Sequence, residues 1–250
     1  MTWQETTSPS FQARHDARDA DTVVGVLEQL EDVRTRLERW FTIPAERIAV
    51  VLHPSSAQLA LAQPAVPLLR RLTTPAARRY LAGWFAAHEI HVLAPRPLAA
   101  RASNVPGSRE MLQLTPGALY AQLVVGRANP ALPPPFRPAT VARYARWAWL
   151  AAGAGQWFSG QTAHARPAIG RRLREGGEPR FPPAIRDAQL LGGSVFDLLA
   201  REEGASAAAA LAVAELHDQR RLLEHAFRGR SFVHTAGAWR SHLARMAAGS

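Results

Sequence analysis

One long internal stretch constrains the fold more than any other feature. Between Met111 and Ala163 the chain contains no His, Asp, Glu or Cys. Inside it, Thr115 and Pro116 are typical of the start of a helix, and Gly126 is typical of its end. The helix predicted between them has no charged side chain on any face, so it has to be buried. The rest of the chain must therefore supply elements that surround it.

The residues before this stretch predict alternating strands and helices. Short apolar runs at residues 11–16, 47–53 and 89–94 predict strands, and the Pro-interrupted residues 56–85 predict helical pieces. Residues 21–41 predict an amphipathic helix, because their apolar side chains recur at helical spacing. Those side chains are Val23, Val26, Leu27, Leu30, Val33, Leu37, Trp40 and Phe41.

The residues after the apolar helix predict further helices. Thr140 is typical of the start of a long helix, and residues 184–203, 206–227 and 235–246 predict three more. The fold class expected is therefore α+β, with a small mixed sheet in residues 1–110 and a mainly helical lobe in residues 111–250. With 47% hydrophobic residues, the chain is expected to form one domain with a substantial core.

Residues 149–160 read Trp-Leu-Ala-Ala-Gly-Ala-Gly-Gln-Trp-Phe-Ser-Gly. This segment resembles the second metal-ligand helix of zincin peptidases, where the pattern is Trp-Leu-x-Glu-Gly-x-Ala-x-Tyr/Trp-Phe and the Glu binds zinc. Ala152 occupies the position of that Glu. The order of the predicted elements, and the closing segment Ala238-Trp-Arg-Ser-His-Leu243, are similar to peptidase MA-like domains of the gluzincin type. The resemblance implies a single zincin-like domain over residues 1–250.

The same resemblance implies that the metal ligands are lost. The His-Glu-x-x-His helix of the family corresponds to residues 119–123 or 120–124, where no His or Glu occurs. The general-base Glu is replaced by Tyr120 or Ala121. Hydrocarbon side chains donate no lone pair to Zn²⁺. The expectation is a pseudoenzyme without a cofactor, which binds a peptide or protein or has a structural role.

A peptide partner is expected in the former active-site cleft. The resemblance implies that the cleft is bounded by an exposed edge strand at residues 89–94, which could accept an extended peptide by strand addition. The alternative is that the same side chains fill the emptied pocket as core. We name the predicted residues the former-cleft set: Glu89, His91, Tyr120, Gln122, Ala152, Gln156 and Trp157.

An active metal-dependent hydrolase is the first rival hypothesis, with Glu89, His91 and His53 as non-standard ligands. His88-Glu89-Ile90-His91 is the nearest match to the peptidase motif, but Val92 stands where the second His is needed. On a strand, Glu89 and His91 share a face and His88 points the other way, which allows at most a two-residue chelate from this segment.

Binding of an anion or nucleic acid is the second rival. The formal net charge is +10, and all 30 basic residues are Arg. That replacement of Lys is typical of a GC-rich genome and does not by itself favour nucleic acid, which needs a clustered footprint. One basic run stands out: Arg166, Arg171, Arg172, Arg174 and Arg180. We expect a solvated helix face there, with an anionic partner as the alternative.

The remaining expectations concern location. The chain has no Cys, so disulfides and thiolate metal sites are excluded. Its first residues show neither a basic nor an apolar signal region, and no segment is apolar for long enough to span a membrane. The protein is therefore expected to be cytoplasmic.

Overall fold

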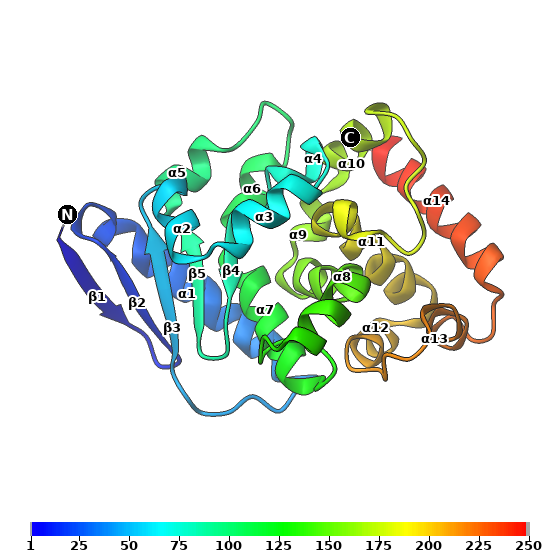
Figure 1. Cartoon of the computed structure of the whole chain (residues 1–250), viewed down its shortest axis with the longest axis horizontal. Helices are drawn as coiled ribbons and strands as arrows, with labels where there is room; N and C mark the ends of the chain where they lie inside the picture. The colour runs from blue at the N-terminus through cyan, green and yellow to red at the C-terminus, as the bar shows by residue number, and fades with distance from the viewer. Residues whose placement is uncertain (1, 249–250) are drawn as a thin grey trace.

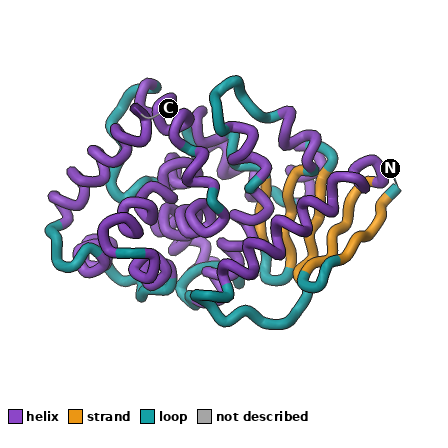
Figure 2. Tube along the Cα trace, turned by 180° about the vertical axis from the view of Figure 1, so that it is seen from behind, coloured by secondary structure: helices purple, strands orange, loops and turns teal. Residues whose placement is uncertain are grey.

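A five-stranded mixed sheet occupies one end of the molecule, and helices fill the rest (Figure 1 and Figure 2). The computed structural model describes residues 2–248. The strand order is β1-β2-β3-β5-β4. The central strands β2, β3 and β5 run parallel, while β1 and β4 are antiparallel edge strands. The bounds are β1 Trp3–Thr7, β2 Phe11–Asp16, β3 Ile48–His53, β4 Gly83–Phe85 and β5 Glu89–Leu93.

The three predicted strands are confirmed, but the prediction that residues 89–94 form an edge strand is wrong. β5 pairs with β3 on one side and with β4 on the other, so Glu89–Leu93 has no free edge. The free edges belong to β1 and β4, and β4 lies within residues 56–85, where the sequence predicts helical pieces. Three residues are too few to show the alternation by which a strand is recognised. β1 was not predicted either, because its residues are polar and mostly exposed.

Helices cover both faces of the sheet. α1 (Ala20–Leu37) lies along the face seen from behind in Figure 2, and α7 (Thr115–Ala128) packs beside it against β4 and β5. α2 (Ser56–Ala62) and α3 (Ala65–Leu72) contact the strands from the other side. α1 ends four residues before the predicted end at residue 41, where Phe41 still packs into the core.

The segments between the sheet and the central helices are short. They comprise the 3-10 helix η1 Ala17–Asp19 and the helices α4 Pro75–Arg78, α5 Pro95–Ala100 and α6 Ser108–Gln113. α5 begins at the carboxyl end of β5, directly after Ala94.

The prediction that residues 115–126 form a buried helix is confirmed. Every residue of α7 from Thr115 to Gly126 is buried, and the helix continues past Gly126 to Ala128. α7 packs on α8 (Pro138–Ser159), and α8 packs on α11 (Ile185–Glu203) more extensively than any other pair of elements. These three helices form the centre of the helical half.

The outer helices complete this half. They are α9 Gln161–His164, α10 Arg166–Arg174, α12 Ala205–Ala212, α13 Gln219–Ala226 and α14 Phe232–Ala248. The single helix predicted over residues 206–227 is therefore two helices, because residues 213–218 leave the helical path. None of the helices in residues 2–248 is long and apolar enough to cross a bilayer.

Candidate functional site

A small cavity lies between α7, β4 and α8, and of the former-cleft set only Gln122 lines it. On α7, Ala118, Leu119 and Gln122 face a cavity with a volume of about 20 Å³. A volume of that size holds about one water molecule. The other lining residues are Tyr80, Leu81, Ala82, Gly83, Trp84, Phe85, Thr115, Tyr144, Gln161 and Gln189. The space is therefore nearly filled by side chains of the protein.

A close approach of two helices closes this space. A methyl group added at Gly155 of α8 would lie 2.6 Å from the carbonyl oxygen of Ala118 and 2.7 Å from Cγ of Gln122. Such distances are far below van der Waals contact, so glycine is required for α8 to approach α7 this closely. Gln122 is buried in the contact.

Aromatic side chains cover the free edge of the sheet beside the cavity. Trp84 of β4 packs against Phe136, which precedes α8, and against Tyr144 of α8, with ring centroids 5.1 and 6.0 Å apart. Phe85 also contacts Phe136, at 5.5 Å. A short edge strand covered in this way offers little room for an added strand.

Tyr120 lies on the other side of α7, away from this cavity. Its ring packs edge-to-face on Phe11 of β2, with the centroids 4.9 Å apart, and Arg34 of α1 donates a 3.5 Å hydrogen bond to its hydroxyl. Burial raises the pKa of the Tyr120 hydroxyl. Tyr120 is therefore not among the positions of α7 that face the cavity, which are Thr115, Ala118, Leu119 and Gln122.

The three α8 members of the former-cleft set belong to the packing of α8. Ala152 is fully buried. Gln156 donates to the carbonyl of Ala188 at 3.1 Å and accepts from the backbone N–H of Gly193 at 2.7 Å, so its amide joins α8 to α11. The ring of Trp157 lies 6.5 Å from that of Phe196 on α11. The structure therefore does not bring the set together in one cleft.

Glu89, His91 and His53 do come together, on the neighbouring strands β3 and β5. His53 Nε2 and His91 Nδ1 are 3.0 Å apart and share a hydrogen bond. On the other side of the His91 ring, a Glu89 carboxylate oxygen lies 3.2 Å from Nε2 but outside hydrogen-bond geometry. This buried nitrogen therefore has no hydrogen-bond partner within residues 2–248. His91 stands between the other two side chains, so the three do not surround a common point.

The protonation of His53 follows from its position. Burial, with a contribution from the neighbouring His91, lowers the pKa of His53 from 6.5 to about 4. His53 is therefore neutral at pH 7. Within residues 2–248, no group of three or more His, Asp or Glu side chains is arranged to hold a metal ion. His88 points away from this group toward Glu46 and Arg127, as the strand alternation predicted.

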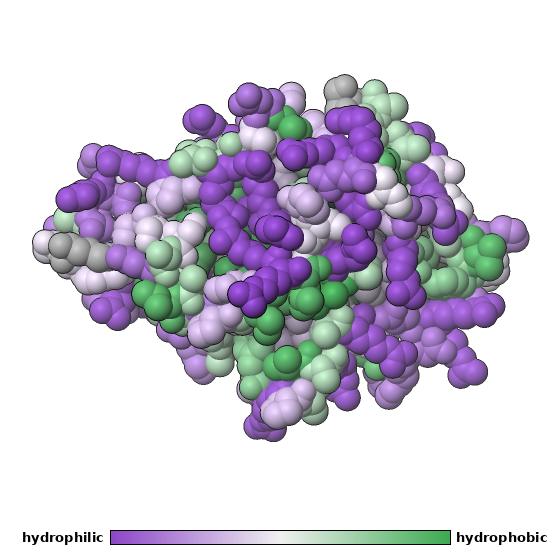
Figure 3. All heavy atoms as spheres, turned by 45° about the horizontal axis from the view of Figure 1, so that its top comes forward, coloured by the Kyte–Doolittle hydropathy of each residue, from purple (hydrophilic) through white to green (hydrophobic). Residues whose placement is uncertain are grey.

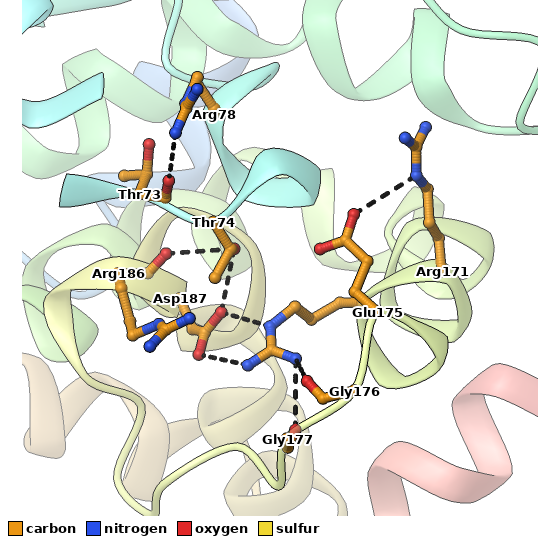
Figure 4. A network of polar contacts seen from close by, with 10 residues as sticks. Thr73, Thr74, Arg78, Arg171, Glu175, Gly176, Gly177, Arg186 and Asp187 are labelled. Atoms are coloured by element: carbon orange, nitrogen blue, oxygen red, sulfur yellow. Dashed lines mark hydrogen bonds and ion pairs between the residues drawn. The ribbon is translucent and has the colours of Figure 1, made fainter. Parts of the chain in front are cut away.

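The predicted basic run is partly committed to internal contacts. Arg172 forms a two-pronged ion pair with Asp187, at 2.6 and 3.0 Å, and both side chains are buried (Figure 4). Arg171 pairs with Glu175 at 3.6 Å. Arg166, Arg174 and Arg180 are exposed, without a carboxylate partner within 4.0 Å among the described residues. The five arginines therefore do not form one basic site.

A second group of arginines lies outside the basic run and was not predicted from the sequence. Arg70, Arg78, Arg79 and Arg101 line an open hollow of about 310 Å³ together with Pro75. The sequence contained a signal for them, since no Asp or Glu occurs between Glu46 and Glu89 while Arg-Arg pairs occur at residues 70–71 and 78–79. Comparison of the chain with protein-family models, curated proteins and solved structures found no match.

Proposed function

We propose that this protein is a catalytically degenerate metallopeptidase-like protein, with a zincin-like scaffold and a binding or structural role instead of hydrolysis. The observation that carries the proposal is the closure of the α7–α8 contact. Where a peptidase needs an open cleft, Gly155 packs directly on Ala118 and Gln122, and only about 20 Å³ remains. A hydrolytic site has to admit both a water molecule and a peptide bond.

The chemistry of the cavity-facing side chains agrees with this proposal. Ala118 and Leu119 are hydrocarbons, and Gln122 offers only a neutral amide. A catalytic zinc site uses His, Cys, Asp or Glu as its protein ligands and keeps one position open for water. The buried Ala152 likewise supplies no donor atom.

A peptide bound by strand addition is not favoured by the geometry. β5 has neighbours on both sides, and the free edge of β4 is covered by Phe136 and Tyr144. A partner that adds a strand would therefore have to use the free edge of β1, at the other end of the sheet, and any other partner would bind elsewhere on the surface.

The active-hydrolase alternative rests on Glu89, His91 and His53. Their proximity favours it, but the ring of His91 uses one nitrogen toward His53 and presents the other to Glu89. A single ion could not be bound by all three side chains unless at least one of them turned.

Zinc content distinguishes the two hypotheses. The purified full-length protein is incubated with Zn²⁺, dialysed, and measured by elemental mass spectrometry, in parallel with a peptidase assay on mixed peptides. The pseudoenzyme proposal expects no stoichiometric zinc and no zinc-dependent hydrolysis. One zinc retained per chain and lost in His91→Ala would overturn it in favour of the alternative. The matched control is His88→Ala, because His88 lies on the same strand region but points the other way.

A further inference from the structure

The arginine hollow lies outside the former-cleft set and is built by three separate helices. We use this name for the space lined by Arg70, Arg78, Arg79 and Arg101. Arg70 comes from α3, Arg78 and Arg79 from the end of α4, and Arg101 from the residue that follows α5. Figure 3 shows hydrophilic residues gathered across the middle of the face that it brings forward. The fold thus brings four guanidinium groups from three different helices to one concave surface.

No carboxylate neutralises these four charges. None of the four has an Asp or Glu side chain within 4.0 Å among the described residues, although arginines elsewhere form such pairs, for example Arg34 with Glu38 and Arg201 with Asp197. A solvated basic face would not explain the convergence, because isolated arginines gain nothing from gathering in a hollow where their charges repel each other.

Backbone carbonyls hold the guanidinium groups in place. Arg101 donates to the carbonyl of Arg79 at 2.8 Å, and Arg79 donates in return to the carbonyl of Arg101. Arg78 donates to the carbonyl of Thr73 at 3.1 Å (Figure 4). Carbonyl and hydroxyl oxygens are neutral acceptors, so these bonds leave the positive charges unneutralised even at Arg101, where all three nitrogens donate. The cluster is therefore ordered without a counter-ion.

Of the four arginines, Arg70 is the one with a buried nitrogen that lacks a hydrogen bond. Its Nε atom is buried and has no hydrogen-bond partner among residues 2–248. Burial, followed by the nearby charge of Arg78, lowers the pKa of the Arg70 guanidinium. An unpaired buried donor on a cation is costly, and an anion in the hollow would offset part of that cost by neutralising the charge of the same guanidinium.

We propose that the arginine hollow is a binding site for a compact, multiply charged phosphate group. Arginine forks match the oxygens of phosphate in pairs, and several of them together favour a group that carries more than one negative charge. The volume of about 310 Å³ admits a ligand of the size of a diphosphate. The lining contains no aromatic side chain on which a base could stack, which does not favour a single-stranded nucleic acid.

The phosphate could belong to a soluble molecule or to a lipid headgroup. Leu61, Leu68 and Leu72 of α2 and α3 are among the most exposed large apolar side chains, and they lie on the two helices that lead to the hollow. A lipid headgroup would place these side chains at a bilayer surface. Both sources share the same recognition chemistry, and the experiment has to separate them.

The test uses isothermal titration of the full-length protein with pyrophosphate at low salt and again at physiological salt. We expect saturable binding with one site per chain, weaker at the higher salt. Arg78→Gln should lower the affinity about tenfold or more, because it removes a charge-assisted hydrogen bond to the ligand. Arg71→Gln is the matched control: it removes the same charge from an exposed neighbour outside the hollow and should change the affinity less than about twofold.

A parallel arm measures co-sedimentation with vesicles that do or do not contain phosphorylated inositol lipids. Vesicle binding that requires those lipids and is lost in Arg78→Gln assigns the phosphate to a headgroup, while pyrophosphate binding alone assigns it to a soluble ligand. Circular dichroism confirms that each variant is folded, and Arg70→Gln serves as a second test if Arg78→Gln is not. Absence of binding in both arms overturns the proposal. Equal losses in Arg71→Gln and Arg78→Gln also overturn it, because they indicate diffuse charge attraction.

Discussion

At the scale of single residues, Arg172 and Asp187 form a buried ion pair with two hydrogen bonds. Their side chains are 4% and 3% exposed. Thr74 donates a further hydrogen bond to Asp187 at 3.1 Å, and Arg172 donates to the carbonyls of Gly176 and Gly177. Sequence patterning could not reveal this pair, because Arg172 sits in a run of arginines and its partner lies on another helix.

Removing one member of this pair should strongly destabilise the fold. Arg172→Met leaves the Asp187 carboxylate buried without its cation, which we expect to lower the free energy of unfolding by about 3–5 kcal/mol. The measurement is urea unfolding followed by circular dichroism. Arg171→Met is the control, since its pair with Glu175 is partly exposed and should contribute less than about 1 kcal/mol. Similar losses for the two variants would contradict this reading of the pair.

The pKa of His53 makes stability depend on pH. Its folded-state pKa of about 4 lies below the unfolded value of 6.5. Between these values the unfolded chain binds a proton that the folded chain does not, so stability falls as the pH falls from about 6.5 to about 4. The full effect is on the order of 3 kcal/mol.

The urea midpoint of His53→Asn should therefore change less between pH 7 and pH 4.5 than the midpoint of the wild type. His217→Asn, whose side chain is 84% exposed, should leave the slope unchanged; a parallel shift in both variants would argue against His53 as the cause.

At the scale of elements, α8 and α11 cross with their backbones almost in contact. A methyl group added at Gly153 would lie 2.6 Å from the carbonyl oxygen of Gly192, and one added at Gly192 would lie 2.7 Å from the carbonyl oxygen of Trp149. The amide of Gln156 then joins the same two helices through two hydrogen bonds. The crossing depends on glycine for close approach, because neither backbone has room for a side chain.

Gly153→Ala should therefore push the two helices apart. We expect a loss of about 1–3 kcal/mol in the free energy of unfolding, as for other overpacked cores. Gly237→Ala on α14 is the matched control, because no atom lies within 4 Å of the added methyl group. It should be neutral or stabilise by up to about 1 kcal/mol through helix propensity. Chemical denaturation of both variants measures the two changes in the free energy of unfolding. No loss for Gly153→Ala would show that the helices can move apart without cost.

The elements themselves were predictable where the apolar pattern was long. The helix at residues 21–41, the buried helix after Thr115 and the strands at β2, β3 and β5 all follow from spacing and burial. Strand order did not follow, because the three-residue β4 gives no pattern and its position decides which strand is the edge. The former-cleft set is dispersed for a related reason: Tyr120 packs on Phe11 of the sheet, while other positions of α7 face the cavity.

At the scale of the whole molecule, the sheet and the helices share one apolar core. The ring contact between Phe11 and Tyr120 joins β2 to α7, and Phe41 packs on Phe158 of α8 with centroids 5.3 Å apart. One cluster of buried side chains runs from the strands to Trp239 on α14. A boundary near residue 110 is therefore a change of secondary structure within a continuous interior.

A continuous core predicts that the two halves unfold together. Native-state hydrogen exchange should give the same opening free energy, and the same dependence on urea, for the most protected amides of β3 and of α11. Mass spectrometry of peptic peptides provides the measurement. A lower opening free energy for β3 alone would mean that the sheet separates from the helices before they unfold.

Thr74 connects the arginine hollow to this interior. Its backbone N–H and its hydroxyl reach the carbonyl of Arg186 and the carboxylate of Asp187, at the start of α11. Thr74 lies between Arg70 and Arg78 in the chain, so the segment that presents these cations is anchored to the helical half. Binding in the hollow should consequently stabilise residues beyond those that contact the ligand. Amide exchange should become slower into the first turns of α11. The melting temperature, followed with a fluorescent dye, should rise when the hollow is occupied, so candidate ligands can be screened in this way.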